Sequence, residues 1–280
     1  MSAPAPPGAP TLDRLKEPGT IDDVLRNIDQ ILDWAKEAKN PIGYFAILYR
    51  RVTLGIRDAI NDGEFVDGPR IERLDVAFAK RYFNALNAYF YPDEFEGLTL
   101  PWKVAFVGDQ DHQAIIVQHM LAGLNAHIRF DLGLALLTVA GDWPYSLRED
   151  YDRVNDLLCA QIPGINKEVQ KRSPELRWLR VLIPDEISEM QKAVTKLREE
   201  AWLFGFYLAK NPGNATEKTV HQEASTSALS SWYLQPTGRW SPFPWLLREV
   251  TKHEKRNVRK NLDALERISK DPEKMAKARH

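Results

Sequence analysis

The chain has 280 residues, of which 44% are hydrophobic and 28% charged, a composition typical of a folded globular protein rather than a disordered one. Lys and Arg number 38 against 39 Asp and Glu, so a net charge of -1 offers no basic excess and argues against a nucleic-acid partner. No window approaches about 18 uninterrupted apolar residues and no secretory signal opens the chain, so we expect a cytoplasmic protein without a membrane span.

The first residues, 1–18, are rich in Pro and Ala and are expected to form a disordered tail. From residue 20 onward, apolar residues recur at helical spacing between breaks at Pro and Gly. Thr20, followed by two aspartates, is expected to cap the first helix, and Ser146 to cap the fifth with Glu149 in the capping box. Helices are predicted over 20–39, 42–60, 68–91, 109–140, 146–162 and 185–210.

The last part of the chain has weaker patterns. The segment 211–245 is less regular, and a charged helix is predicted over 246–275. No segment alternates like a strand, and no motif repeats at a fixed period. We therefore predict an all-α fold in which residues 19–280 form a single-domain bundle of about six to eight helices.

The segment "LAGLNAHIRFDLGLAL", residues 121–136, would be a plain apolar helix without four polar residues: Asn125, His127, Arg129 and Asp131. An unpaired polar group in a dry interior costs a few kcal/mol, so this pattern indicates either a structural network or a site. His127 and Asp131 are one turn apart, so they can share one divalent metal ion, zinc or iron, or bond to each other. Asn125 is expected to bind a neighbouring backbone, and Arg129 a carboxylate.

Other candidate site residues depend on how the helices meet. Gly123 precedes His127 by one turn, which lets a bulky group, from another helix or a ligand, come close. His119 lies eight residues before His127, about 12 Å along the axis, too far for both to hold one ion. The candidate catalytic residues are His127, Asp131, His119, Tyr82 and Asp75; the last two share a helix face and could line a cavity. Further metal ligands could come from Asp152, Asn155, Asp156, Glu200 or His221.

Several blocks of the sequence resemble a known family. They are "FAILYRRVTLGIRDAI", "RLDVAFAKRYFNAL", "PWKVAF", "HMLAGLNAHIRFDLGLAL", "DRVNDLL" and "LREEAWLFGFYLA", which span about 45 to 210. In content and order they are similar to the blocks of the family filed as domain of unknown function 5995, whose name implies no activity. That family usually has Asn where this chain has Arg129, so no family role is carried over to that side chain.

A shorter likeness concerns Gly123, His127 and Asp131. Their Gly-x-x-x-His-x-x-x-Asp spacing is similar to one metal-binding helix of the zinc-dependent phospholipases C and their nuclease relatives, which are also all-helical. The resemblance implies metal binding for His127 and Asp131 alone, because no other motif of those enzymes matches.

Three functions follow from these patterns. The first is a small-molecule enzyme with a site at the centre of the bundle, where His127 and Asp131 bind a divalent metal and support hydrolysis. The second keeps the site without the metal: His127, oriented by Asp131, acts as general acid or base in an isomerase, cyclase or lyase for a hydrophobic small molecule. The third is a non-catalytic helical binding or scaffold protein.

Overall fold

The computed structural model describes residues 10–109, 113–178, 185–236, 249–254 and 257–274. Within these ranges the chain forms helices and connecting loops and no strand, so the predicted all-α fold is confirmed. The first four helices are α1 (Ile21–Ala38), α2 (Ile42–Asn61), α3 (Gly68–Phe90) and α4 (Leu100–Val107). They are followed by α5 (Ile116–Leu124), α6 (Leu132–Val139), α7 (Tyr145–Arg172), α9 (Glu186–Lys210), α10 (Ala215–Leu234) and α12 (Val258–Ser269), with 3₁₀ turns at Pro174–Trp178 and Pro212–Asn214.

The start of α1 shows how local sequence sets a helix end. The Thr20 hydroxyl accepts a hydrogen bond from the Asp23 backbone N–H, and the Asp23 carboxylate accepts one from the Thr20 N–H. This reciprocal capping box satisfies two donors that the first turn leaves without helical partners. The predicted cap is confirmed.

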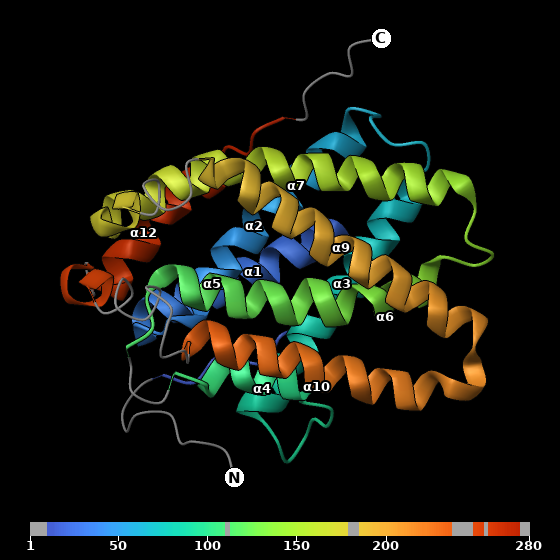
Figure 1. Cartoon of the computed structure of the whole chain (residues 1–280), viewed down its shortest axis with the longest axis horizontal. Helices are drawn as coiled ribbons and strands as arrows, with labels where there is room; N and C mark the ends of the chain where they lie inside the picture. Colours follow the sequence, from blue (N-terminus) through green and yellow to red (C-terminus); the bar gives the residue numbers. More distant parts are fainter. Residues whose placement is uncertain (1–9, 110–112, 179–184, 237–248, 255–256, 275–280) are drawn as a thin grey trace.

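One long helical run passes through the middle of the molecule (Figure 1). It consists of α5, a π-helical segment at Asn125–Asp131 and α6, without interruption. Helices α2 and α3 pack against it from behind in this view, α10 lies alongside it, and α9 crosses in front. The run begins at Ile116 rather than 109, and ahead of it the Asp109 carboxylate accepts hydrogen bonds from the Gln113 and Ala114 N–H groups.

By length and composition, this run (Ile116–Val139) is the one helix among the described residues that could cross a membrane. However, 72% of its most apolar window is buried inside the fold. Its apolar side chains therefore pack against neighbouring helices, as those of a central core helix do.

Two glycines allow the neighbouring helices to approach closely. A Cβ on Gly123 would lie 2.5 Å from the Phe45 ring of α2, and one on Gly133 would lie 2.5 Å from the Phe204 ring of α9. The bulky group expected beside Gly123 is therefore Phe45, a side chain of the fold itself.

The amino-terminal segment differs from the expected disordered tail. Residues 10–18 lie along α1 and α3, with Leu12 and Leu15 buried. The Asn87 side chain both donates to and accepts from the Leu15 backbone, and the Trp34 indole N–H donates to Pro10 O. Two buried leucines and these backbone contacts order a segment that composition alone suggested was unstructured; residues 1–9 lie outside the described residues.

Both ends of α7 also differ from the predictions. The Ser146 hydroxyl accepts a hydrogen bond from Arg70 instead of capping a helix, because α7 begins at Tyr145. Helix α7 also continues beyond the predicted end, through Pro163, to Arg172.

The carboxy-terminal third is more regular than expected. Residues 215–234 of the segment 211–245 form helix α10, and the rest from 237 onward lies outside the described residues. The predicted helix 246–275 is divided: 249–253 are helical, and the Asn257 side chain caps a separate helix, α12. Leu262 and Leu265 are buried where α12 packs on α1, α2 and α7, so this charged helix belongs to the core.

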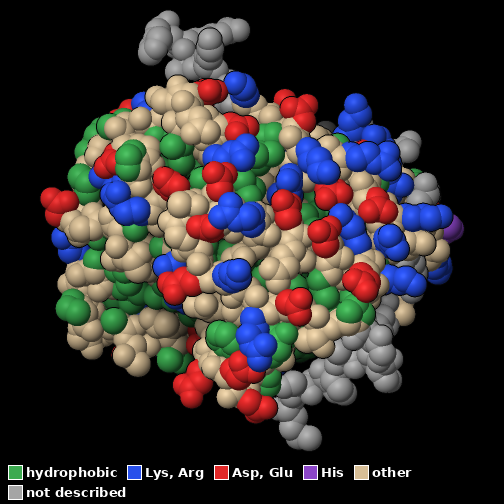
Figure 2. Space-filling model, turned by 180° about the vertical axis from the view of Figure 1, so that it is seen from behind, with side chains coloured by type: hydrophobic (Ala, Val, Ile, Leu, Met, Phe, Trp, Pro, Cys, Tyr) green, Lys and Arg blue, Asp and Glu red, His purple; other side chains and the backbone are tan. Residues whose placement is uncertain are grey.

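Seen from behind, the surface carries Lys and Arg interspersed with Asp and Glu (Figure 2). This mixture fits a chain of nearly zero net charge and differs from the broad basic face of many nucleic-acid-binding proteins.

Candidate active site in a central apolar cavity

His127 lies in the π-helical segment and is only 2% exposed. Its ring stacks on Phe78, with centroids 3.4 Å apart, and meets the rings of Tyr49 and Phe45 edge-on. Neither ring nitrogen makes a hydrogen bond within the described chain. Burial lowers the pKa of His127 more than nearby Asp131 raises it, so the imidazole is neutral at physiological pH.

Asp131 is 1% exposed and already has two strong donors. Arg81 Nε donates to one carboxylate oxygen at 2.8 Å, and the Trp102 indole N–H donates to the other at 2.7 Å. The His127 Nδ1 atom is 3.5 Å from the latter oxygen. Asp131 thus ties α3 and α4 to the central helix, and it is placed to favour the His127 tautomer with the proton on Nδ1 and the lone pair on Nε2.

The π-helical geometry coincides with the polar stretch. Asn125–Asp131 is the π-helical segment, and the Leu132 N–H closes it by donating to His127 O. Single π turns are rare and frequently occur at functional sites. The segment therefore marks the same residues that the sequence singled out.

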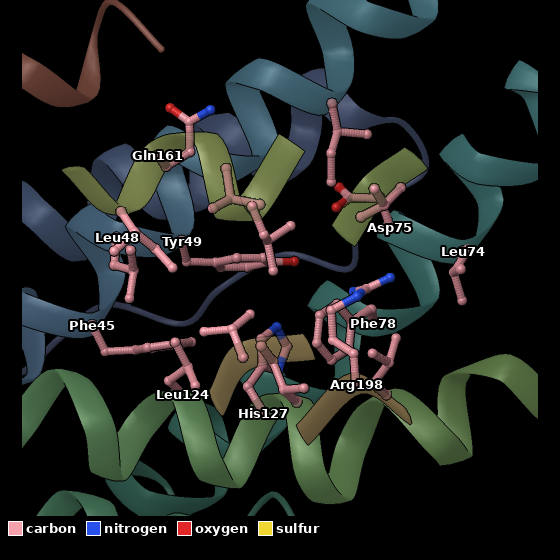
Figure 3. A pocket seen from close by; sticks show the side chains of 18 of the residues that line it. Phe45, Leu48, Tyr49, Leu74, Asp75, Phe78, Leu124, His127, Gln161 and Arg198 are labelled. Atoms are coloured by element: carbon pink, nitrogen blue, oxygen red, sulfur yellow. The ribbon is translucent and has the colours of Figure 1, made fainter. Parts of the chain in front are cut away.

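An apolar cavity lies beside His127. Helices α2, α3, α7, α9 and the central run enclose it, and Figure 3 shows polar groups directed into it from several sides. Its polar lining residues are Tyr49, Asp75, His127, Gln161 and Arg198, and the rest of the wall is aliphatic or aromatic. Small-molecule sites typically combine such an apolar wall with a few polar groups.

Asp75, on α3, is the acidic residue of this wall. It is 4% exposed, and its Oδ2 atom has no hydrogen-bond partner in the described structure. Burial, with a smaller contribution from Glu72, raises the pKa of Asp75 to about 8. At neutral pH Asp75 is therefore a protonated acid that faces an apolar cavity.

Tyr49 and Arg198 also contribute polar groups to the cavity. The Tyr49 hydroxyl is buried without a hydrogen-bond partner in the described chain, and burial raises its pKa well above 10, so it stays neutral. Arg198, on α9, was not singled out in the sequence. The sequence does contain a signal for it. Arg198 follows Val194 by four positions and precedes Ala201 by three, so a charged residue occupies an apolar stripe of the helix.

His119 and Tyr82 do not line this cavity. His119 Nε2 lies 3.5 Å from Asp109 Oδ2 in a different part of the central run. Burial acts to raise the pKa of Asp109, but the hydrogen bonds from His119 and the backbone outweigh it and lower that pKa. Tyr82 is fully buried against Trp102 and Phe45. Of the candidate catalytic residues, the structure brings His127 and Asp75 to one cavity, with Asp131 behind His127.

The other polar residues of the central segment tie helices together. The Asn125 side chain donates to Thr226 O and Ser230 Oγ on α10, and Arg129 donates to Glu200 at 2.9 Å. Both predictions for these residues are confirmed. The remaining suggested ligands are also elsewhere: Asp152 binds Arg148, Asn155 binds Thr195, Asp156 does not line the cavity, and His221 lies near Glu217 on the surface.

The described residues contain no group of three or more His, Cys, Asp and Glu side chains arranged to hold a metal ion. His127 and Asp131 would supply two ligands, and each carboxylate oxygen of Asp131 also accepts one hydrogen bond, from Arg81 or from Trp102.

Comparison with known proteins gives one match. No curated protein and no solved structure matches the chain. The model of a family of unknown function matches residues 21–236, which include all helices from α1 to α10 and every polar residue of the cavity. Because this match covers well over half of its length, the chain belongs to that family, DUF5995.

Proposed function

We propose that the protein is an enzyme that binds a hydrophobic small molecule in the central cavity and transforms it by metal-free acid–base chemistry, as an isomerase, cyclase or lyase. One observation carries this proposal: an acid and a base, Asp75 and His127, line the same apolar cavity, and their Oδ2 and Nε2 atoms are buried there without a hydrogen-bond partner in the described chain. Titratable groups with pKa values shifted by burial are characteristic of catalytic sites.

The two groups have complementary protonation states at neutral pH. The Asp75 carboxyl, with its raised pKa, gives its proton to one carbon of a substrate double bond. His127 Nε2 removes a proton from a neighbouring carbon, and that C–H electron pair forms the new double bond. His127 then returns its proton to Asp75 through a water molecule, so the isomerisation is balanced without an oxidant or reductant. Asp131 orients the imidazole throughout.

The surroundings of His127 and Asp131 support this version over metal-dependent hydrolysis. A zinc or iron site needs at least three protein ligands, and the described residues hold no group of three His, Cys, Asp or Glu side chains that includes these two. Elemental analysis of tag-free protein and of a His127→Ala variant separates the two versions. Stoichiometric metal in the wild type that is lost in the variant would favour hydrolysis.

Deuterium transfer to carbon tests the proposed chemistry without a known substrate. The protein is incubated in D₂O with a total lipid extract of the expression cells, and the lipids are then analysed by mass spectrometry. We expect wild-type protein to introduce deuterium at carbon into at least one compound that it binds, and Asp75→Asn and His127→Gln to bind that compound without labelling it.

Asp33→Asn is the control for the loss of a carboxylate, because that side chain is exposed and far from the cavity. Equal labelling by wild type and both cavity variants would overturn the proposal. Binding by the wild type without any labelling would favour the alternative prediction, a non-catalytic binding protein.

A further inference from the structure

Arg198 is a buried cation without an anionic partner. It is 4% exposed, and no carboxylate of the described chain lies within ion-pair distance of it. Of its five N–H donors, one on Nη2 binds Tyr151 O at 2.9 Å, while Nε is buried without a partner in the described residues. Arginine remains protonated in proteins, so a positive charge lies in the cavity wall at a cost that an anion would relieve.

The guanidinium is also held in place. Its central carbon lies 4.0 Å from the centroid of the Tyr151 ring, and the Tyr151 hydroxyl donates to Arg198 O. Figure 3 shows the guanidinium directed into the cavity, between the sides that carry Asp75 and His127. Tyr151 therefore fixes the orientation of a donor group whose free N–H bonds are available to a ligand.

A second hollow continues the cavity between α5, α7 and α9. It is lined mainly by aliphatic side chains, and its polar lining residues are Asn166, Gln170, Glu186 and Tyr233. The two hollows share five wall residues: Leu48, Leu124, Ile162, Ile165 and Val194. Along α7 the combined wall runs from Val154 to Gln170, about 24 Å at the helical rise of about 1.5 Å per residue.

We propose that the ligand is a long-chain carboxylic acid whose carboxylate binds Arg198 and whose apolar chain extends into the second hollow. This inference rests on the proposed function, since it uses the same cavity and names its substrate class. A single anionic charge fits because Arg198 is the one Lys or Arg side chain that lines either hollow in the described structure. A diphosphate would need several cations to balance its charge. With the carboxylate at Arg198, the chain passes through the cavity whose wall also carries Asp75 and His127.

A fluorescent fatty acid and its methyl ester provide matched probes of this head-group recognition. The probes are cis-parinaric acid and methyl parinarate, which share the same chain and differ in charge. We expect the wild type to bind the acid at least about tenfold more tightly than the ester, since only the acid can accept buried, charge-assisted hydrogen bonds from Arg198. We expect Arg198→Met to remove this preference while keeping the affinity for the ester.

Three further variants sharpen the test. Arg198→Lys should retain part of the preference because it keeps the charge, and Arg26→Met, which removes an exposed arginine, should leave both affinities unchanged. Met190→Trp fills the second hollow and should weaken both probes. Unchanged ester binding also shows that Arg198→Met has folded. Equal affinity of the wild type for acid and ester, or a preference that survives Arg198→Met, would overturn the inference.

The two proposals fail in different ways. If the acid is preferred but no lipid is labelled in D₂O, the result supports the carboxylic acid site and overturns the proposed acid–base chemistry. If a neutral lipid is labelled and the acid is not preferred, the chemistry stands and the ligand class is wrong.

Discussion

Two polar regions meet at the central helix, and they differ in whether their groups have partners. In the first region, the Asp131 carboxylate accepts hydrogen bonds from Arg81 and Trp102, so each of its two oxygens has a partner within the fold; we call this the closed cluster. In the neighbouring cavity, Asp75 Oδ2 and His127 Nε2 are also buried but have no hydrogen-bond partner in the described chain. A buried polar group without a partner destabilises the fold. The hydrogen bonds of Asp131 therefore have a structural role, whereas the unpartnered groups of the cavity would be stabilised by a bound ligand.

The largest expected effect comes from breaking the closed cluster. Asp131→Ala leaves the Trp102 indole N–H buried without an acceptor and removes the partner of Arg81, which is 31% exposed and can turn to water. We expect the free energy of unfolding to fall by about 3 kcal/mol, measured by urea denaturation. Asp33→Ala, at an exposed carboxylate, is the control. A decrease in the free energy of unfolding below about 1 kcal/mol would show that the hydrogen bonds of Asp131 do not stabilise the fold in this way.

Replacing Asp75, in the cavity, should stabilise the protein instead of destabilising it. Asp75 has a folded pKa of about 8 against 3.8 in the unfolded chain, so between these values the folded state binds the additional proton. The free energy of unfolding therefore decreases as pH rises from about 4 to about 8. Asp75→Asn removes this decrease, so we expect it to stabilise the protein by a few kcal/mol near pH 8 and much less near pH 5.

Urea denaturation of wild type and Asp75→Asn at both pH values checks the prediction. A difference in stability that does not change with pH would mean that Asp75 ionises normally. The same protonation predicts that labelling in D₂O declines as pH rises through about 8, because Asp75 loses the proton that it donates.

The close contact beside His127 links the two regions. A methyl group on Gly123 would overlap the Phe45 ring, which also lines the cavity. We expect Gly123→Ala to lower the free energy of unfolding by about 2 kcal/mol through overpacking and to weaken ligand binding by displacing Phe45. Gly213→Ala, where the new methyl meets no atom within 4 Å, should change neither quantity. Normal binding and stability in Gly123→Ala would show that the helix can shift to accept the methyl.

The smallest effect is expected at the surface end of the polar stretch. Arg129 and Glu200 form a partly exposed ion pair, so Arg129→Ala should change the free energy of unfolding by about 0.5 kcal/mol. A double-mutant cycle with Glu200→Ala measures the coupling. A coupling energy above about 2 kcal/mol would show that the Arg129–Glu200 pair behaves as a buried ion pair instead.

Local patterns predicted much of the fold because they act within a few residues. The Thr20–Asp23 capping box begins α1, and the apolar stripe of α9 follows from spacing alone. Predictions were weaker where packing overrides local preference. Helix α7 continues through Pro163, and residues 10–18 are ordered by burial of Leu12 and Leu15.

The candidate site could be predicted only in part. His127 was found because it interrupts an apolar helix, and Asp75 because it shares a helix face with Tyr82. His119 and Tyr82, also predicted as catalytic, line a different, smaller hollow. Arg198 was missed because a cation on a helix is usually solvated, and only the packing of α9 against α7 places it in the cavity wall.

By itself, the sequence determined that this chain forms helices and that an imidazole and a carboxylate, one turn apart, enter its core, because helical periodicity is a property of neighbouring residues. Tertiary structure alone decided which buried groups found partners. Trp102 and Arg81 reach Asp131 from 29 and 50 positions away, while Asp75 and Arg198 reach the cavity and meet no opposite charge in the described chain. Partners at such separations are set by helix packing, which local spacing does not encode.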